Sequence, residues 1–461
     1  MSRRKLRQIV WYLLIFSLCG FGAYALVVDV SPIIVWLLFS IPLSWLVYLL
    51  IVRYPEITFA LFLTAGVYAW QAPNTPLHLA AVLGVLSTIG VLHRMLIKRE
   101  ITPFVPPLRI LVPYLGILLL SFLSLAYTPS PLYGVNKLLK LCTTTTLAFL
   151  LPFYLFRREK AIDRFFIAYV FIALVMFIDI LINGLEPGKL ERRTAFGSDY
   201  ITSARVWSNA AVILFFYLLP KSRNTLEKVL CILASGAVLF SLFASGTRGP
   251  AIATIVALLV ALALHIGKAS SEMLNYSRIK RADLSILLSV LVFLILSVVL
   301  FFFFHEYFVA FFYRLFLLAE GGERSALERL SRYSAAFNVM KSFPSSLLGL
   351  GIGGFQTYYH GFDTVNGDYP HNILLEVGAE LGLIGLALFL SFVFLTFREA
   401  FYILKKSEAP KTYLLDFVLF GLFLNMLVNS LLSGDINDNR LVFTWASMIF
   451  SVRGMLKNEE A

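Results

Sequence analysis

Long apolar runs constrain the fold of this chain more than any other feature. Roughly 14 stretches of about 19 residues are apolar enough to cross a bilayer as helices. They lie at 9–28, 32–52, 57–71, 77–93, 108–127, 138–156, 162–183, 207–220, 228–247, 250–267, 284–304, 379–397, 412–433 and 440–456. Because about 20 apolar residues span the hydrocarbon core, the pattern predicts a single all-α polytopic membrane domain over residues 1–461, with roughly 12–14 transmembrane helices.

The charge content agrees with a membrane protein and argues against a nucleic-acid-binding protein. Only 14% of the residues are charged, whereas soluble domains carry about 25%. A formal net charge of +12 would suggest nucleic acid in a soluble protein. No basic run with interleaved aromatic residues lies outside the apolar spans, so we expect membrane lipids and no nucleic acid as partners.

The distribution of basic residues predicts the orientation in the membrane. When the spans alternate from a cytoplasmic N-terminus, about two thirds of the 39 Lys and Arg fall on the cytoplasmic side. Both termini are then cytoplasmic. The run at 9–28 is expected to be a first transmembrane helix rather than a signal peptide, because no A-x-A-like cleavage site follows it.

Two loops on the outer side are long, at residues 184–206 and 305–372. Within the second, residues 324–342 have apolar positions recurring at three and four, the spacing of an amphipathic helix. We expect a helical periplasmic cap whose apolar face lies on the membrane surface or against the helix bundle.

The segment "PHNILLEVGAELGLIG", residues 370–385, carries the most distinctive polar residues. His371 and Asn372 follow a proline, and Glu376 and Glu380 share one face of the next helix. One interpretation is an interfacial histidine at a helix N-terminus, with glutamates near the positive end of the helix dipole. The depth of Glu380 favours a functional role, since ionisable groups inside membranes are costly.

Basic residues on the outer side form two further candidate sites, both suited to binding an anion. Arg248 lies in "SGTRGP", residues 245–250, where small neighbours let an anion approach the backbone. The alternative is an arginine that snorkels from a tight turn. Arg193 and Arg205 lie in the 184–206 loop, for which the alternative is a solvated loop with internal ion pairs.

Several kinds of site have no matching motif. The chain has no CxxC pair, HExxH, DxD or Walker loop, and no GxGxxG before a strand. We therefore expect no metal site and no cofactor. "DIND", residues 435–438, has the wrong spacing for a metal-bound sugar nucleotide and predicts an outer turn.

The three patches, in this order, resemble the O-antigen ligase and O-antigen polymerase superfamily, which also includes protein O-oligosaccharyltransferases. That family has a pattern of roughly PHNxxLxxxxExGxxG, and residues 370–385 match every fixed position. "SGTRGP" matches its small–Ser/Thr–Arg–Gly turn. "WSNAA" replaces the family's NPN, so either Arg193 or Arg205 corresponds to the upstream arginine. The resemblance covers about residues 184–400.

The resemblance implies a GT-C-like glycosyltransferase of the bacterial inner membrane, with its active site facing the periplasm. The donor would be an undecaprenyl-diphosphate-linked glycan and the acceptor a hydroxyl of lipid A–core. His371 would act as base. Arg248, with Arg193 or Arg205, would bind the diphosphate, and Asn372 would contact substrate.

The resemblance also implies that Glu380 orients His371 or Asn372. Direct attack of the acceptor hydroxyl on the anomeric carbon would invert its configuration and would need no metal. An apolar groove between helices would hold the polyprenyl tail.

Other functions stay open at this point. A sibling polymerase would use a second lipid-linked repeat unit as acceptor, and a protein O-oligosaccharyltransferase would use a protein. A secondary transporter or flippase would place ionisable residues near the midplane, often in two repeats. The candidates here cluster on one side without a visible repeat, which favours the ligase.

Overall fold

The computed structural model describes residues 40, 44–45, 47–68, 79–101, 105–183, 188, 192–271, 280–321, 324–406 and 410–459. The predicted span at 9–28 and most of the one at 32–52 lie outside these residues. Residues 47–53, at the end of the second span, are helical.

Every regular element among the described residues is a helix. The α-helices are α3 (Pro55–Leu63), α4 (Ala65–Tyr68), α5 (Leu79–Leu92), α6 (Leu108–Ser124), α7 (Pro131–Lys140), α8 (Thr146–Leu150), α9 (Pro152–Leu155), α10 (Glu159–Asn183), α11 (Tyr200–Ile213), α12 (Leu219–Lys221), α13 (Thr225–Ala244), α14 (Arg248–Ser271), α15 (Lys280–Phe304), α16 (Val309–Ala319), α17 (Arg324–Lys341), α18 (Ser345–Leu348), α19 (Phe355–His360), α20 (Ile373–Lys406), α21 (Pro410–Leu432) and α22 (Arg440–Glu459). Short π-helical or 3-10 turns are η2 (His93–Ile97), η3 (Leu141–Thr145), η4 (Leu214–Leu218) and η5 (His305–Phe308).

These helices confirm the predicted all-α polytopic class. In the described part of the chain, 8 helices are long and apolar enough to cross a membrane, and two apolar helices are shorter, Leu108–Ser124 and Arg248–Leu264. With 25 residues, α10 is about 37 Å long, more than the roughly 30 Å of a bilayer core. The predicted break near residues 246–250 separates α13 from α14.

The core of the bundle lies around α11 and α21, where 83% of the residues in the apolar part of each helix are buried. Polar side chains join these helices to α14. The Ser208 hydroxyl lies 2.7 Å from the Thr254 hydroxyl and accepts a hydrogen bond of 2.8 Å from the Asn425 amide. Such bonds between helices replace the water that a membrane interior lacks.

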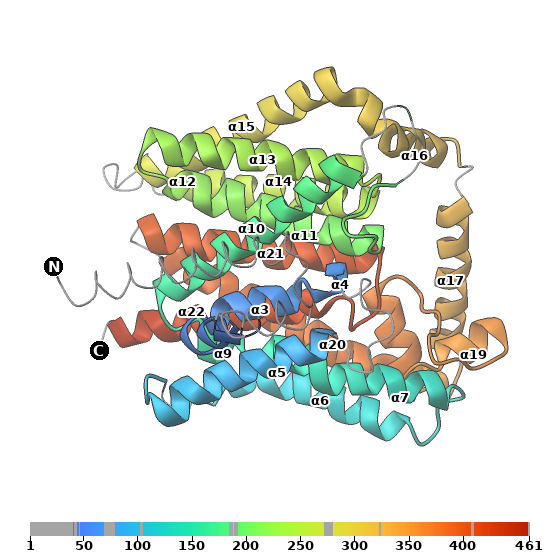
Figure 1. The fold of residues 1–461 in the computed structure, drawn as a ribbon. Coiled ribbons are helices and arrows are strands. Elements are labelled where there is room, and N and C mark those ends of the chain that lie inside the picture. The colour runs from blue at the N-terminus through green and yellow to red at the C-terminus, as the bar shows by residue number, and fades with distance from the viewer. Residues whose placement is uncertain are drawn as a thin grey trace, which may run out of the picture.

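The segment between α15 and α20 forms a helical cap. Figure 1 shows α16, α17 and α19 at one end of the bundle, opposite the C-terminal end of α22. As predicted, residues 324–341 are helical. Their apolar face is only partly covered, because Ala336 and Val339 are buried whereas Leu327 and Leu330 stay exposed.

The first long loop is shorter than its predicted range of 184–206. The α11 helix begins at Tyr200, because the Asp199 side chain accepts a hydrogen bond of 2.9 Å from the Thr202 N–H and so caps the helix. Arg205 is therefore a helical residue rather than a loop residue.

Candidate active site

His371 lies where the cap meets α20. Its backbone has φ 58°, a conformation that is uncommon for a residue with a side chain. Its Nε2 lies 3.8 Å from Asp368 Oδ1, and its buried Nδ1 has no hydrogen-bond partner among the described residues. The Tyr369 ring lies beside the imidazole, with 4.4 Å between ring centroids. One nitrogen thus faces a carboxylate, and the other is left for a ligand.

The charge state of His371 follows from its surroundings. Burial and the positive charges of Arg329 and Arg332 lower its pKa to about 4, against the opposing effect of Asp368. The imidazole is therefore neutral near pH 7, the state in which it can accept a proton.

Asp368 is itself held by the cap. Its Oδ2 accepts hydrogen bonds from Arg332 Nε at 2.7 Å and lies 2.9 Å from His360 Nε2. Although burial opposes the change, these bonds lower the pKa of Asp368. A carboxylate that stays charged beside Nε2 favours a proton on that nitrogen and leaves Nδ1 as the basic atom.

Asn372 caps α20. Its Oδ1 accepts hydrogen bonds from the N–H groups of Leu374 and Leu375, at 3.0 and 3.2 Å, and its Nδ2 donates to the Leu431 carbonyl at 3.0 Å. The Asn372 amide, expected to contact substrate, instead joins α20 to the end of α21. Its role in fixing the helix start accounts for its place directly after His371.

The α20 helix is broken at Gly382, which has φ 66° and ψ −169°. The break exposes the carbonyls of Ala379 and Glu380, which accept hydrogen bonds of 2.9 Å from the N–H groups of Leu350 and Gly351. A Cβ at Gly382 would overlap the Leu347 carbonyl. The kink therefore docks the cap loop against the segment that carries His371.

Glu380 does not contact His371. Its Oε2 accepts a hydrogen bond of 2.7 Å from Lys137 Nζ of α7, and its buried Oε1 has no partner among the described residues. Glu376 Oε1 lies 2.5 Å from the same ammonium group and accepts a hydrogen bond of 3.2 Å from the Ile436 N–H. The expected orienting contact is thus wrong, because this buried cluster holds both carboxylates.

Arg248 opens onto a small basic cavity of about 50 Å³ beneath the cap. Arg192, Arg314 and Arg329 also line it, and none of the described residues that line it is a carboxylate. Arg248 Nη1 donates to the Arg314 carbonyl at 2.9 Å, and the Arg192 guanidinium lies 3.7 Å from the Tyr200 ring centroid. Since Arg248 is also the first residue of α14, the positive end of that helix adds to the cavity's affinity for anions.

Of the two upstream candidates, neither Arg193 nor Arg205 lines this cavity. Arg205 is buried and donates to the carbonyls of Ser433, at 2.7 Å, and Asp438, at 3.2 Å. It thereby supports the turn between α21 and α22, which contains the "DIND" residues. Residues 436–439 form a turn, as predicted, and Asp435 and Asn437 are buried.

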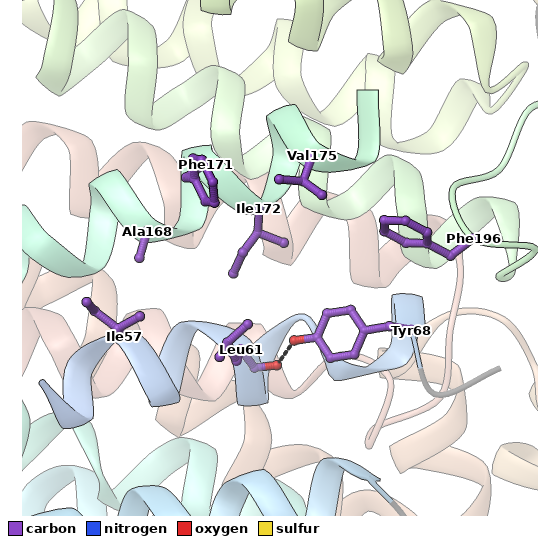
Figure 2. Close-up of a pocket in the computed structure, with 8 residues that line it drawn as sticks. All are labelled: Ile57, Leu61, Tyr68, Ala168, Phe171, Ile172, Val175 and Phe196. Carbon is purple, nitrogen blue, oxygen red and sulfur yellow. Dashed lines mark hydrogen bonds between the residues drawn. The ribbon is translucent and has the colours of Figure 1, made fainter. Parts of the chain in front are cut away.

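An apolar groove of about 450 Å³ is lined by residues of α3, α4 and α10, together with Phe196 (Figure 2). Phe196 and Tyr68 lie at one end of it, and Ile57 and Ala168 at the other. Phe196 follows Arg192 by four residues, and its N–H donates to Asp179 Oδ2 at 2.6 Å. The segment with the cavity arginine thus also borders the groove.

Sequence reasoning missed three of the four cavity arginines and Lys137. Arg314 and Arg329 lie in the cap, where basic residues carry no distinctive motif. Lys137 gave a signal, because it lies at the edge of an apolar span. Among the described residues, no group of three or more His, Cys, Asp or Glu is placed to hold a metal ion.

A comparison with protein families identifies the region that contains most of this site. Residues 233–390 match the family model described as O-Antigen ligase. The match includes Arg248, Arg314, Arg329, His371 and Glu380. No curated protein matches the sequence. The chain is thus a multi-pass membrane protein in which residues 233–390, about a third of its length, are similar to the O-antigen ligase family, and this similarity supports an activity of the ligase or polymerase type.

Proposed function

We propose that the protein is an O-antigen ligase. It transfers a glycan from undecaprenyl diphosphate to a hydroxyl of lipid A–core at the periplasmic face of the bacterial inner membrane. In this proposal the cap faces the periplasm and both termini face the cytoplasm. Transfer is metal-independent and inverts the anomeric carbon.

The observation that carries the proposal is the cavity lined by four arginines. A lipid diphosphate leaves with two or more negative charges, which fixed cations stabilise. Guanidinium groups match phosphate oxygens in pairs, and the α14 N-terminus adds backbone N–H donors. Arg192, Arg248, Arg314 and Arg329 would share this task, with Arg192 taking the role expected of Arg193 or Arg205.

His371 is the proposed base. Arg329 joins the two parts of the site, since it lines the arginine cavity and its charge acts on His371. An acceptor hydroxyl that reaches Nδ1 would supply the hydrogen-bond partner that this atom lacks. The hydroxyl proton passes to Nδ1 and its oxygen bonds to the anomeric carbon, while the bond from that carbon to the diphosphate oxygen breaks.

The remaining predicted residues support this geometry rather than touch substrate. Glu380 would act as a positioning residue through Lys137, and Asn372 as the cap that fixes the start of α20. The apolar groove of Figure 2 would hold the polyprenyl tail, because it borders the segment that places Arg192.

Purified protein, polyprenyl-diphosphate glycan and lipid A–core, with a chelator present, test the proposal directly. His371→Ala should abolish the product while the variant keeps the thermal stability of the wild type. His305→Ala is the matched control, since His305 is an exposed residue of the cap segment. Normal transfer by the His371 variant would exclude the base assignment, and a requirement for a divalent metal would exclude the arginine mechanism.

Neighbouring arginines provide a second comparison. Arg192→Gln should raise KM for the donor by roughly tenfold or more, as loss of a charge-assisted phosphate contact does. Arg193→Gln should leave KM near the wild-type value, because Arg193 does not line the cavity. Equal effects of the two substitutions would count against the cavity as the diphosphate site.

The choice of acceptor separates the ligase from the alternatives. A second lipid-linked repeat unit in place of lipid A–core would yield product only if the protein is a polymerase. A transporter or flippase would move the lipid-linked glycan across vesicles without forming a glycosidic bond.

A further inference from the structure

A second basic cavity, separate from the arginine site beneath the cap, has a volume of about 150 Å³. It is lined by Arg94, Arg157, Arg158, Arg164, Glu100 and Tyr154, together with apolar residues. Its walls come from η2, the end of α9 and the start of α10. Ser451, near the C-terminal end of α22, donates to the carbonyls of Pro152 and Phe156 beside it, at 3.3 and 3.1 Å. The cavity therefore lies toward the end of the bundle opposite the cap (Figure 1).

Arginines outnumber carboxylates among the described residues around this cavity. Glu56 is fully buried beneath it and forms ion pairs with Arg94, at 3.3 Å, and with Arg164. Arg157 Nε donates to the Phe153 carbonyl at 3.1 Å, which fixes its stem. Among the described residues, four guanidinium groups thus lie near two carboxylates, Glu56 and Glu100. Burial lowers the pKa of Arg157, the effect of moving a cation out of water.

Two apolar side chains of η2 are exposed close to Arg94 in the sequence. Leu96 is 67% exposed and Ile97 is 71% exposed, two and three residues after Arg94. Basic groups and exposed apolar side chains on one short segment suit an amphiphile, whose charged headgroup and acyl chains are adjacent. The cavity's position at the ends of membrane-spanning helices is the level at which lipid headgroups lie.

We propose that this cavity binds the phosphate headgroup of an anionic membrane phospholipid. The guanidinium groups of Arg157 and Arg158 would contact the phosphate oxygens, and the acyl chains would lie along Leu96 and Ile97. Free phosphate shares the headgroup chemistry but has no acyl chains to contact Leu96 and Ile97. This site is independent of the proposed glycan transfer, since it lies at the other end of the bundle.

Native mass spectrometry of the full-length protein with defined lipids tests the proposal. Cardiolipin or phosphatidylglycerol should bind in preference to phosphatidylcholine. Arg157→Gln with Arg158→Gln should weaken anionic-lipid binding by at least about fivefold, since each basic residue near a membrane surface contributes on this scale. The matched control is Arg223→Gln, which removes an exposed arginine outside the cavity.

A single Arg158→Gln variant guards against misfolding, because Arg158 is exposed. It should weaken the same lipids by a smaller factor. Unchanged lipid preference in both variants would overturn the proposal, as would an equal loss with Arg223→Gln. Thermal stability is also measured with inorganic phosphate and with the lipids at equal phosphate concentration. Stabilisation by inorganic phosphate but not by the lipids would show that a lipid is not the ligand.

Discussion

Lys137 is the residue whose replacement tests the packing of this site most severely. Its side chain and that of Glu376 are each 1% exposed, and that of Glu380 is 3% exposed. One ammonium group thus faces two carboxylates at 2.5 and 2.7 Å. Breaking a buried ion pair by removing one partner costs about 3–5 kcal/mol, because the other partner stays buried without compensation.

The loss of stability caused by Lys137→Met should lie in the upper part of that range. Glu376 keeps its hydrogen bond from the Ile436 N–H, at 3.2 Å, whereas Glu380 loses the ammonium and has no partner at Oε1 among the described residues. Methionine is close to lysine in volume, so the loss reflects charge rather than a cavity. We expect the apparent Tm in a fixed detergent to fall by several degrees.

A double-mutant cycle separates charge from packing. Adding Glu380→Gln to Lys137→Met removes one stranded charge and should recover a large part of the lost stability, whereas Lys140→Met, in the same helix and outside the cluster, should change little. A wild-type Tm for Lys137→Met would refute the reasoning. A double variant no more stable than the single one would show that packing dominates.

Two further outcomes follow from the site geometry. Because its pKa lies near 4, His371 stays neutral above about pH 5, so kcat/KM for transfer should be level from pH 5 to 8 and fall only as His371 is protonated below that range. A decline centred near pH 6.5 would contradict this account. Gly382→Ala should destabilise the protein by more than 2 kcal/mol, roughly, because positive φ and overlap with the Leu347 carbonyl act together. Gly361→Ala, with φ 80° and no atom near its Cβ, should cost less, and chemical unfolding measures both.

The sequence predicted those features that repeat along the chain. Apolar runs of about 20 residues located the 8 long apolar helices of the described part of the chain, because the bilayer fixes their length. The short pattern around His371 and the turn at Arg248 located two parts of the candidate site. Each of these is a local signal, readable within about 20 residues.

Contacts between distant segments were not readable in this way. Lys137 meets Glu380 across 243 positions of the chain, and no local pattern couples a helix-end lysine to that carboxylate. Arg314 and Arg329 approach Arg248 only because the cap folds back over α14. The break at Gly382 was expected as continuous helix, since glycine spacing alone does not distinguish close packing from a positive φ.

The pairing of Glu376 and Glu380 with Lys137 helps to explain why the arginine cavity can stay positive. Negative groups near a diphosphate site would weaken it by several-fold each. Here Glu376 and Glu380 face Lys137 in the interior, and Asp368 faces Arg332 and His360, so none of these three carboxylates lines the cavity. The kink at Gly382 joins these arrangements, because it fixes the cap loop to the helix that carries both glutamates. Charges of opposite sign are thus kept in separate parts of one site, and His371 lies at their boundary.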